Sequence, residues 1–220
     1  MTESRGVSVV GAGGHAKVVI STLRDAGFTI ATVLDDDESR IGSEILGFRV
    51  EGTTQHLLEQ DGSDAVLAIG DNSRRRQLAG RFSSVRWITV VHPTATVDPS
   101  VKIGHGTVVF AGAVIQAETT LGAHVIVNTG AMIDHDCLIG DFAHLGPGSH
   151  LAGTVEVREG AMLGIGGVVV PGTRIGSWTT VGAGAAVTRD LPAGVTAVGI
   201  PARPLRSGRR AGERGRGSTS

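Results

Sequence analysis

The residue best suited to acid–base chemistry in this sequence is His135, which has a carboxylate on each side. It lies in the segment Ile133-Asp134-His135-Asp136-Cys137. A carboxylate beside an imidazole stabilises the imidazolium and raises the basicity of the ring, which a general base needs. The segment therefore predicts that His135 takes a proton from a substrate, with the flanking carboxylates raising the basicity of its ring. The alternative is a surface histidine in a polar loop.

A second candidate site is the Gly-rich turn Gly11-Ala12-Gly13-Gly14-His15-Ala16-Lys17. It follows an apolar strand expected over Val7–Val10 and leads into a helical pattern over Val18–Ala26. Backbone N–H groups at a helix start suit a phosphate. With Asp35 about twenty residues further on, the turn also matches the G-x-G-x-x-A fingerprint of dinucleotide sites. A histidine here would crowd a pyrophosphate bound as in most NAD sites. The acidic run 35–38 could equally be a solvated loop.

The elements around this turn alternate between short apolar runs and helical patterns, which predicts a small parallel sheet with helices. Further strands are expected over Thr29–Leu34, Ala65–Ile69 and Trp87–Val91, and helices over Thr53–Gln60 and Ser73–Ser83. Ligands of such sheets bind beyond the C-terminal ends of the strands. The Gly-rich turn, the acidic run and Gly70-Asp71-Asn72 all fall at that edge.

A six-residue repeat dominates the second half of the chain. From Val97 to Val187 every sixth residue is aliphatic, sixteen times without a break, and the residue two positions earlier is small. This period fits neither a helix nor a simple strand alternation and is typical of a parallel β-helix. The aliphatic and small residues, Cys137 among them, are expected to point inward, and His135 outward. Gly often follows the aliphatic residue, where we expect it to permit the corner conformation.

Composition excludes several classes of function. A net charge of −1 gives no reason to expect nucleic acid or a membrane surface as a partner. No apolar run reaches the ~18 residues of a membrane helix, and the N-terminus lacks the pattern of a secretory signal. One cysteine cannot form a disulfide framework, which favours a reducing compartment. We therefore expect a cytoplasmic protein.

The chain divides into three expected segments. Residues 1–92 form the α/β domain and residues 93–205 form the coil with its closing turn. Residues 206–220 form a polar, Arg- and Gly-rich tail that is expected to be disordered.

The repeat resembles that of the hexapeptide-repeat acyltransferases, whose triangular coils hold three hexads each and are left-handed. Sixteen hexads then make about five coils. Together with the GHAK turn, Asp35-Asp36 and Gly70-Asp71-Asn72, the chain is similar to bacterial nucleotide-sugar N-acetyltransferases and the related sialic acid O-acetyltransferases. The resemblance implies a Rossmann-like α/β domain that binds a nucleotide sugar, followed by a left-handed parallel β-helix that binds acetyl-CoA. It also implies a homotrimer with active sites between neighbouring coils.

The resemblance implies roles for individual residues. His135 is the catalytic base, and its acidic neighbour, Glu in some relatives, is Asp136 here. The residues implied near the nucleotide sugar are Gly13, Gly14, His15, Asp35, Asp36 and Gly70. The residues implied at acetyl-CoA are His144 near the thioester, the backbone of Ile165 and Ala183 along the pantetheine, and Arg203 at a phosphate.

The expected function is acetyl-CoA-dependent N-acetylation of a nucleotide-activated 4-amino-4,6-dideoxy sugar. Transfer is expected to be direct, without an acyl-enzyme, since Cys137 is expected to face inward. One alternative is O-acetylation of a sialic acid or another sugar. Acylation of an amino-acid precursor is a further alternative, against which the N-terminal domain argues. Two alternatives belong to other classes of protein. One is a non-catalytic trimeric scaffold, and the other is an NAD-binding oxidoreductase fused to a trimerising coil.

No metal is expected. The γ-type carbonic anhydrases use the same coil with zinc-binding histidines, two of them five residues apart. No two histidines of this sequence have that spacing, and there is no CxxC or HExxH motif. The identity of the sugar and of its nucleotide is encoded in no motif that we can identify.

Overall fold

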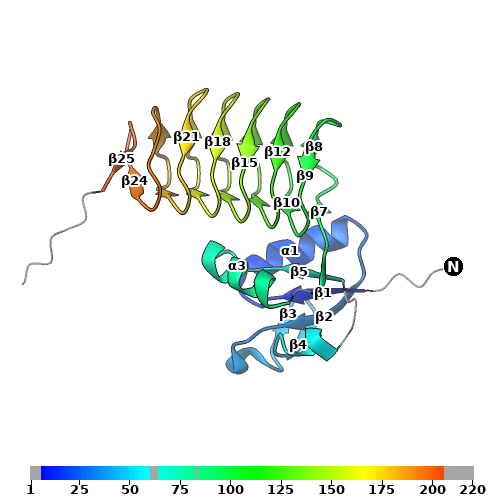
Figure 1. Cartoon of the computed structure of the whole chain (residues 1–220). Helices are drawn as coiled ribbons and strands as arrows, with labels where there is room; N and C mark the ends of the chain where they lie inside the picture. Colours follow the sequence, from blue (N-terminus) through cyan, green and yellow to red (C-terminus); the bar gives the residue numbers. More distant parts are fainter. Residues whose placement is uncertain (1–5, 60–63, 83, 206–220) are drawn as a thin grey trace, which may run out of the picture.

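The computed structural model describes residues 6–59, 64–82 and 84–205, and the tail expected over 206–220 lies outside this part of the chain. An α/β domain formed by the N-terminal residues packs against one end of a long coil (Figure 1). Throughout the described residues, every helix is too short or too polar to cross a lipid bilayer.

The α/β domain contains one six-stranded sheet in the order β3-β4-β2-β1-β5-β6. Its strands are β1 (Val7–Val10), β2 (Ile30–Leu34), β3 (Glu44–Ile45), β4 (Phe48–Gly52), β5 (Asp64–Leu67) and β6 (Arg86–Trp87). Its helices are α1 (Gly14–Asp25), α2 (His56–Glu59) and α3 (Asn72–Arg81). The neighbouring strands β1 and β5 are buried along their whole length, as parallel strands covered on both faces must be.

The domain confirms three of the expected strands and differs from expectation elsewhere. Helix α1 starts at Gly14, inside the Gly-rich turn, and α2 starts at His56, later than the expected start at residue 53. Residue 60, the expected end of that helix, lies outside the described residues. The antiparallel hairpin β3–β4 was not expected, because its residues alternate weakly and its turn depends on positive φ angles at Leu46 and Gly47.

The strand expected over Trp87–Val91 is two strands in two different sheets. Strand β6 pairs with β5 in the α/β domain, whereas β7 (Val90–Val91) pairs with β10 (Val108–Val109) of the coil. The coil therefore begins at Val90, ahead of the expected start at residue 93. The sequence does not reveal this division, because residues 87–91 read as one continuous apolar run and both strands are buried on at least one face.

The coil is a parallel β-helix with three faces, and paired residues such as Val108 and Ile126 are one 18-residue turn apart. The first face holds β7, β10, β13 (Ile126–Val127), β16 (His144–Leu145), β19 (Met162–Leu163), β22 (Thr180–Val181) and β24 (Thr196–Val198), to which β25 (Arg203–Pro204) pairs antiparallel. The second face holds β8 (Thr96–Val97), β11 (Val114–Ile115), β14 (Met132–Ile133), β17 (His150–Leu151), β20 (Val168–Val169) and β23 (Ala186–Val187). The third face holds β9 (Lys102–Ile103), β12 (Thr120–Leu121), β15 (Leu138–Ile139), β18 (Glu156–Val157) and β21 (Arg174–Ile175).

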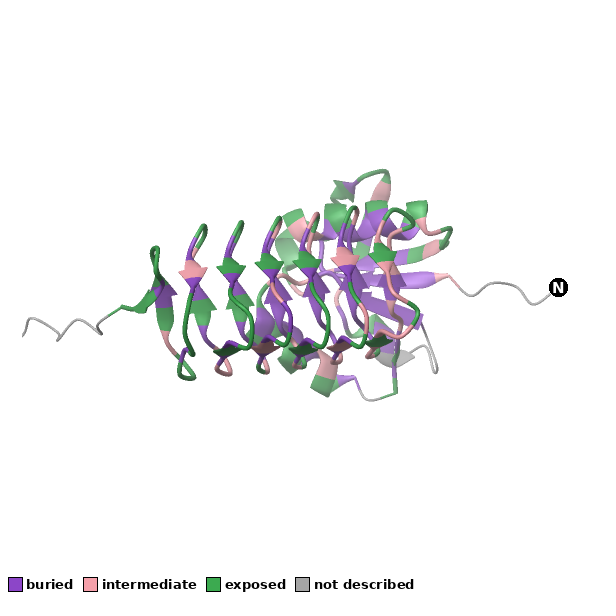
Figure 2. Cartoon of the chain, turned by 90° about the horizontal axis from the view of Figure 1, so that it is seen from above, coloured by how far each residue is buried: buried purple, intermediate pink, exposed green. Residues whose placement is uncertain are grey.

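The hexad residues fill the inside of the coil. Every aliphatic position from Val109 to Val187 is buried, as are the small positions beside them. Cys137 is fully buried, and its Sγ lies 3.3 Å from the carbonyl oxygen of Ala152. The inward orientation predicted for these residues is therefore confirmed, and Figure 2 shows the buried interior beneath exposed corners.

The corners correct the role that we expected for glycine. The residue with positive φ comes three positions after the aliphatic residue, as at Gly112 and Asp136, and not directly after it. The glycines directly after it are needed for close packing. A Cβ atom at Gly164, for example, would lie 2.7 Å from the backbone nitrogen of Ala183 in the next coil.

We name the corners by the faces that they join. The first corner, between the first and second faces, has positive φ at Gly112, Gly130, Gly148, Gly166 and Gly184. The second corner, between the second and third faces, has it at Glu118, Asp136, Thr154 and Gly172. The third corner, between the third and first faces, has it at Gly106, His124, Phe142, Gly160 and Trp178.

The α/β domain packs on the first face. One apolar cluster includes Val108, Phe110 and Ile126 of the coil together with Ala16 and Val19 of helix α1. Outward residues of this face that would otherwise contact solvent are thereby buried between the two parts. At ~25 cal/mol for each Å² of buried apolar surface, this shared cluster favours a fixed arrangement of the domain on the coil.

Candidate active site

The first part of the candidate site is a cavity of about 400 Å³ at the C-terminal edge of the sheet in the α/β domain. Helix α1 begins there with Gly13 as its N-cap residue and without a capping side chain, so its first N–H groups have no side-chain acceptor. Of the predicted substrate residues, five line the cavity: Gly13, Gly14, His15, Asp35 and Gly70. Such a helix start is suited to an anionic group.

The two predicted acidic residues have different roles in the structure. Asp35 accepts hydrogen bonds from the backbone nitrogens of Ala12 (2.6 Å) and Asp37 (2.9 Å), and so fixes the Gly-rich turn to the end of β2. Asp36 turns away from the cavity and accepts hydrogen bonds from the backbone nitrogen and hydroxyl of Thr54. Asp36 is therefore not among the lining residues, although the sequence grouped it with them.

Two arginines in the cavity wall were not predicted. Arg40 donates to the carbonyl oxygen of Ala12 (3.1 Å) and pairs with Asp37 at 3.3 Å. Arg74 reaches the wall from the first turn of α3, whose N-cap Asp71 accepts a hydrogen bond from the Arg74 backbone. The spacing of Arg74 within a run of three arginines gave no reason to single it out.

His15 and His144 meet at the boundary between this cavity and the coil. The centres of their rings are 6.2 Å apart, and the His15 ring contacts Phe110 edge-on. Burial and the nearby Arg75 lower the pKa of each histidine to about 4. Both rings are therefore neutral near pH 7.

The hydrogen bonds of His144 indicate which nitrogen carries its proton. Nε2 lies 3.1 Å from the amide nitrogen of Asn128, which donates, so Nε2 accepts. Nδ1 then carries the hydrogen and faces the carbonyl oxygen of Gly70 at 3.4 Å. His144 is 7 % exposed and serves as a neutral donor and acceptor rather than as a base.

Arg75 joins the α/β domain to the coil. This buried guanidinium donates to the carbonyl oxygens of Ile69, His124 and Phe142. Asn72 accepts from Arg75 and donates to the carbonyl oxygen of Gly160. His124, Phe142 and Gly160 occupy the third corner of successive coils, so one turn of helix contacts three coils. The sequence analysis interpreted these residues only as part of a basic helix.

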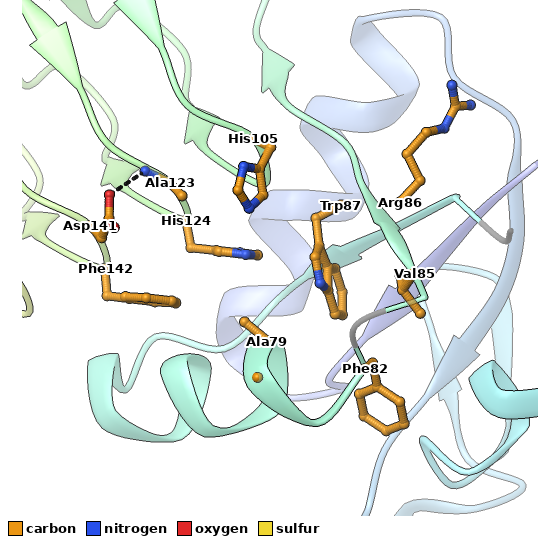
Figure 3. A pocket seen from close by; sticks show the side chains of 11 residues that line it. Ala79, Phe82, Val85, Arg86, Trp87, His105, Ala123, His124, Asp141 and Phe142 are labelled. Carbon is orange, nitrogen blue, oxygen red and sulfur yellow. Dashed lines mark hydrogen bonds between the residues drawn. The ribbon is translucent and has the colours of Figure 1, made fainter.

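A second cavity, of about 530 Å³, lies beside this junction (Figure 3). The His124 ring stacks on Phe142 at 5.1 Å and contacts Trp87 and His105 edge-on. In Figure 3 the side chain of Asp141 accepts the backbone hydrogen bond of Ala123, at 2.8 Å. The predicted catalytic, substrate and cofactor residues all lie elsewhere.

His135 and Asp136 form the second part of the candidate site, at the second corner between β14 and β15. Positive φ at Asp136 turns its carboxylate back toward the imidazole, and His135 Nδ1 lies 2.7 Å from Asp136 Oδ2. The two side chains are 57 % and 56 % exposed. The hydrogen bond to Asp136 raises the pKa of His135. Asp134 instead accepts the backbone N–H of His135.

Within the part of the chain that the structure describes, this arrangement leaves one ring nitrogen of His135 without a hydrogen-bond partner. With Nδ1 bonded to the carboxylate, Nε2 is the nitrogen left to take a proton, and the exposed side chain confirms the predicted outward orientation. The second corner is separated from the first face by the interior of the coil, so a single chain does not bring His135 to the cavity at α1.

The residues predicted for acetyl-CoA follow the first corner toward the C-terminal end. His144 precedes this corner in one coil, Ile165 lies in the corner of the next, and Ala183 lies one coil further on. The backbone carbonyl of Ile165 accepts from Gly184, and the Ile165 side chain is 63 % exposed. Arg203 is exposed in β25 at the end of the first face.

Within the described residues, no group of three or more His, Cys, Asp and Glu side chains is arranged to hold a metal ion.

Comparison with known proteins relates both parts of the chain to the same enzymes. Residues 7–82 match the family described as the PglD N-terminal domain. The chain is 45 % identical to the solved PerB of Caulobacter crescentus, in complex with CoA and GDP-perosamine, over 91 % of this chain and 97 % of that one (TM-score 0.86). It is 41 % identical to the acetyltransferase domain of PglB from Neisseria gonorrhoeae FA1090, in complex with acetyl coenzyme A, over 92 % and 100 % (TM-score 0.85).

A curated relative from Bacillus subtilis strain 168, named UDP-N-acetylbacillosamine N-acetyltransferase, is 43 % identical over 112 residues, 49 % of this chain. The chain spans about half of that relative, 52 %, and smaller shares of others, such as 21 % of a mimivirus protein.

Proposed function

Because the chain belongs to the hexapeptide-repeat N-acetyltransferases of bacterial nucleotide sugars, with their left-handed β-helix, we propose that it transfers acetyl from acetyl-CoA to an amine of a nucleotide-activated amino sugar. The observation that carries the proposal is the His135–Asp136 pair. It presents His135 Nε2 on an exposed corner. The cavity at the start of α1 in the same chain suits an anionic sugar nucleotide.

The proposed reaction is a direct transfer. His135 Nε2 takes a proton from the sugar amine as the nitrogen attacks the thioester carbonyl. The C–N bond forms, the tetrahedral intermediate collapses, and the C–S bond breaks. The CoA thiolate leaves and recovers the proton from the imidazolium. Asp136 stabilises that imidazolium and holds Nδ1–H, and a base of this kind contributes ~10²–10⁴-fold.

The cavity at α1 is the proposed site of the nucleotide sugar. The N–H groups at Gly13 and Gly14 and the cations of Arg40 and Arg74 suit its diphosphate. Asp35 supports the turn that presents those N–H groups. Amino-sugar nucleotides in the names and complexes of the relatives support the expected class, a 4-amino-4,6-dideoxy sugar.

The proposed acetyl-CoA site runs along the first corner. Neutral His144, held between Asn128 and Gly70, would lie near the thioester, and the exposed residues Ile165 and Ala183 would present their backbone to the pantetheine. Arg203 lies at the C-terminal end of this line, where it would meet a phosphate. Buried Cys137 takes no part.

A homotrimer would complete the site. The second face is a stripe of outward residues that includes Val114, Met132 and Val168, the last two of them exposed. If three chains packed these faces around a threefold axis, each first corner would meet the second corner of its neighbour. His135 of one chain would then reach the sugar and acetyl-CoA held by the next. We also propose a cytoplasmic location, which an unpaired buried cysteine supports.

The test is release of CoA thiol from acetyl-CoA with a panel of acceptors. The panel contains UDP-, GDP- and dTDP-linked 4-amino-4,6-dideoxy sugars and free sialic acids. We expect turnover with at least one amino-sugar nucleotide and an N-acetylated product. Turnover only with sialic acid would replace N- by O-acetylation. CoA binding without turnover on any acceptor would contradict the proposed substrate class.

A further inference from the structure

Gly153 lies directly beside the His135 ring, one coil further along the second corner. The 18-residue turn places residue 153 in register with residue 135. A Cβ atom at residue 153 would lie 2.6 Å from both Cε1 and Nε2 of His135, and 3.2 Å from Nδ1. These separations are far shorter than van der Waals contact, so the ring occupies the space that any side chain at this position would need.

The backbone itself does not require glycine at this position. Gly153 is absent from the described residues with positive φ, whereas Gly172 of the same corner has φ +67°. An alanine could therefore adopt the conformation of Gly153 without backbone strain. The three atoms nearest to such a Cβ atom all belong to the His135 ring, which gives a steric reason for glycine at this position.

The backbone of Gly153 is also held in place, so the ring would have to move. The carbonyl oxygen of Gly153 accepts from the backbone nitrogen of Gly172 (3.1 Å), and Thr154 donates to the carbonyl oxygen of His135 (2.9 Å). These bonds belong to the ladder that joins successive coils. The His135 ring, in contrast, has no such ladder: among the described residues its side-chain hydrogen bond goes to Asp136, and it lies against Gly153.

We propose that Gly153 is a positioning residue for the catalytic base: by lacking a Cβ atom it lets the His135 imidazole lie against the next coil with Nδ1 on Asp136 and Nε2 directed to the substrate. This inference rests on the proposed function, in which His135 is the base. Gly153 contributes no chemistry of its own.

The test is the Gly153→Ala variant, assayed for kcat and KM with the accepted amino sugar. Displacement of a reacting group by about 1 Å costs ~10²-fold in rate, and we expect kcat to fall by roughly that factor. KM for both substrates and the melting temperature should change little. The matched control is Gly80→Ala, in helix α3, where a new Cβ atom meets nothing within 4 Å; it should retain wild-type kcat.

A double variant separates positioning from a general structural effect. In the His135→Ala background there is no ring to displace, so adding Gly153→Ala should cause no further loss of kcat and no loss of sugar binding. A further loss of the same size as in the wild-type background would overturn the proposal, because Gly153 would then act independently of His135.

A readout other than activity tests the placement if the proposed function itself fails. In histidine-labelled protein, the His135 resonance is assigned by its loss in His135→Ala and titrated by NMR. We expect Gly153→Ala to lower the pKa of His135 toward the ordinary value, because the displaced ring loses Asp136. An unchanged pKa together with an unchanged ring environment would refute the inference, whether or not the wild-type protein acetylates an amino sugar.

Discussion

His135 and His144 lie nine residues apart on one coil, yet the structure gives them opposite properties. His135 stands on an open corner, where Asp136 raises its pKa. His144 lies on the face covered by the α/β domain, where burial and Arg75 lower its pKa to about 4. The difference shows that position in the coil decides the chemistry of a histidine here. A corner residue can exchange protons with a substrate, and a residue on the covered face can only hold a fixed hydrogen bond.

The largest expected effect follows from removing the open histidine. His135→Ala should lower kcat by ~10²–10⁴-fold, the contribution of a general base. CoA binding, measured by calorimetry, should be unchanged, because the residues proposed to hold CoA lie along the first corner and do not include His135. Wild-type kcat in this variant would remove His135 from the mechanism.

Arg75 holds the α/β domain on the first face of the coil. Its removal should therefore lower the free energy of unfolding and leave the chemical step of catalysis unaffected. Arg75→Met leaves the carbonyl oxygens of Ile69, His124 and Phe142 without this donor, which we expect to cost about 3 kcal/mol in the free energy of unfolding. The control is Arg76→Met. Arg76 is exposed, stacks on Trp178 and pairs with Glu159, so its loss should cost less than ~1 kcal/mol. Equal losses in denaturant unfolding would contradict the role assigned to Arg75.

Buried histidines should make the protein less stable in mild acid. His15, His124 and His144 have pKa values lowered to about 4 in the folded chain, against 6.5 when unfolded. The unfolded state therefore binds protons first, and stability falls as the pH drops from 6.5 toward 4. Each histidine contributes at most about 1.4 kcal/mol per pH unit.

His124→Phe tests this slope. The ring stacks on Phe142, which has the same positive φ one coil further on, so phenylalanine suits the position. We expect similar stability at pH 7 and a shallower loss between pH 6.5 and 5, measured by urea unfolding. An unchanged slope would show that His124 already takes up its proton in the folded protein.

The smallest expected change concerns the pH dependence of the reaction. Asp136 raises the pKa of His135, and the base must be deprotonated to act, so activity rises as the pH passes through that pKa. In Asp136→Asn the acid limb of kcat/KM should move to lower pH, with a lower plateau because the ring is less basic. If the acid limb does not move in this variant, the pKa that it reports belongs to a group other than His135.

Much of the coil could be predicted from the sequence, because the hexad repeats a single local environment sixteen times. The inward Cys137 and the outward His135 follow from register alone. The α/β domain was less predictable. Its hairpin β3–β4 and the division of residues 87–91 between two sheets depend on tertiary pairing, which apolar runs do not encode.

The contacts between the two parts of the molecule were the least accessible to sequence reasoning. Arg75 and Asn72 bind main-chain carbonyls of the third corner. Every residue has such a carbonyl, so the side-chain pattern cannot indicate which ones are bound. The burial of His144 likewise depends on which face the α/β domain covers. The contact of Gly153 with His135 was accessible in principle, since the 18-residue period places one above the other.

The most direct test of the account is to ask whether His135 acts on a sugar held by a different chain. Two variants are needed, His135→Ala and Gly14→Asp. The aspartate stabilises the start of α1 but repels a phosphate there, and it has open space around it. Each variant alone should be inactive.

When the two variants are co-expressed in equal amounts, random assortment gives about a quarter of all sites an intact base from one chain and an intact cavity from its neighbour. We expect the mixed assemblies to recover about that fraction of wild-type acetyl transfer. Mixed assemblies as inactive as their parents would contradict a site shared between chains and would place His135 and the sugar on the same subunit.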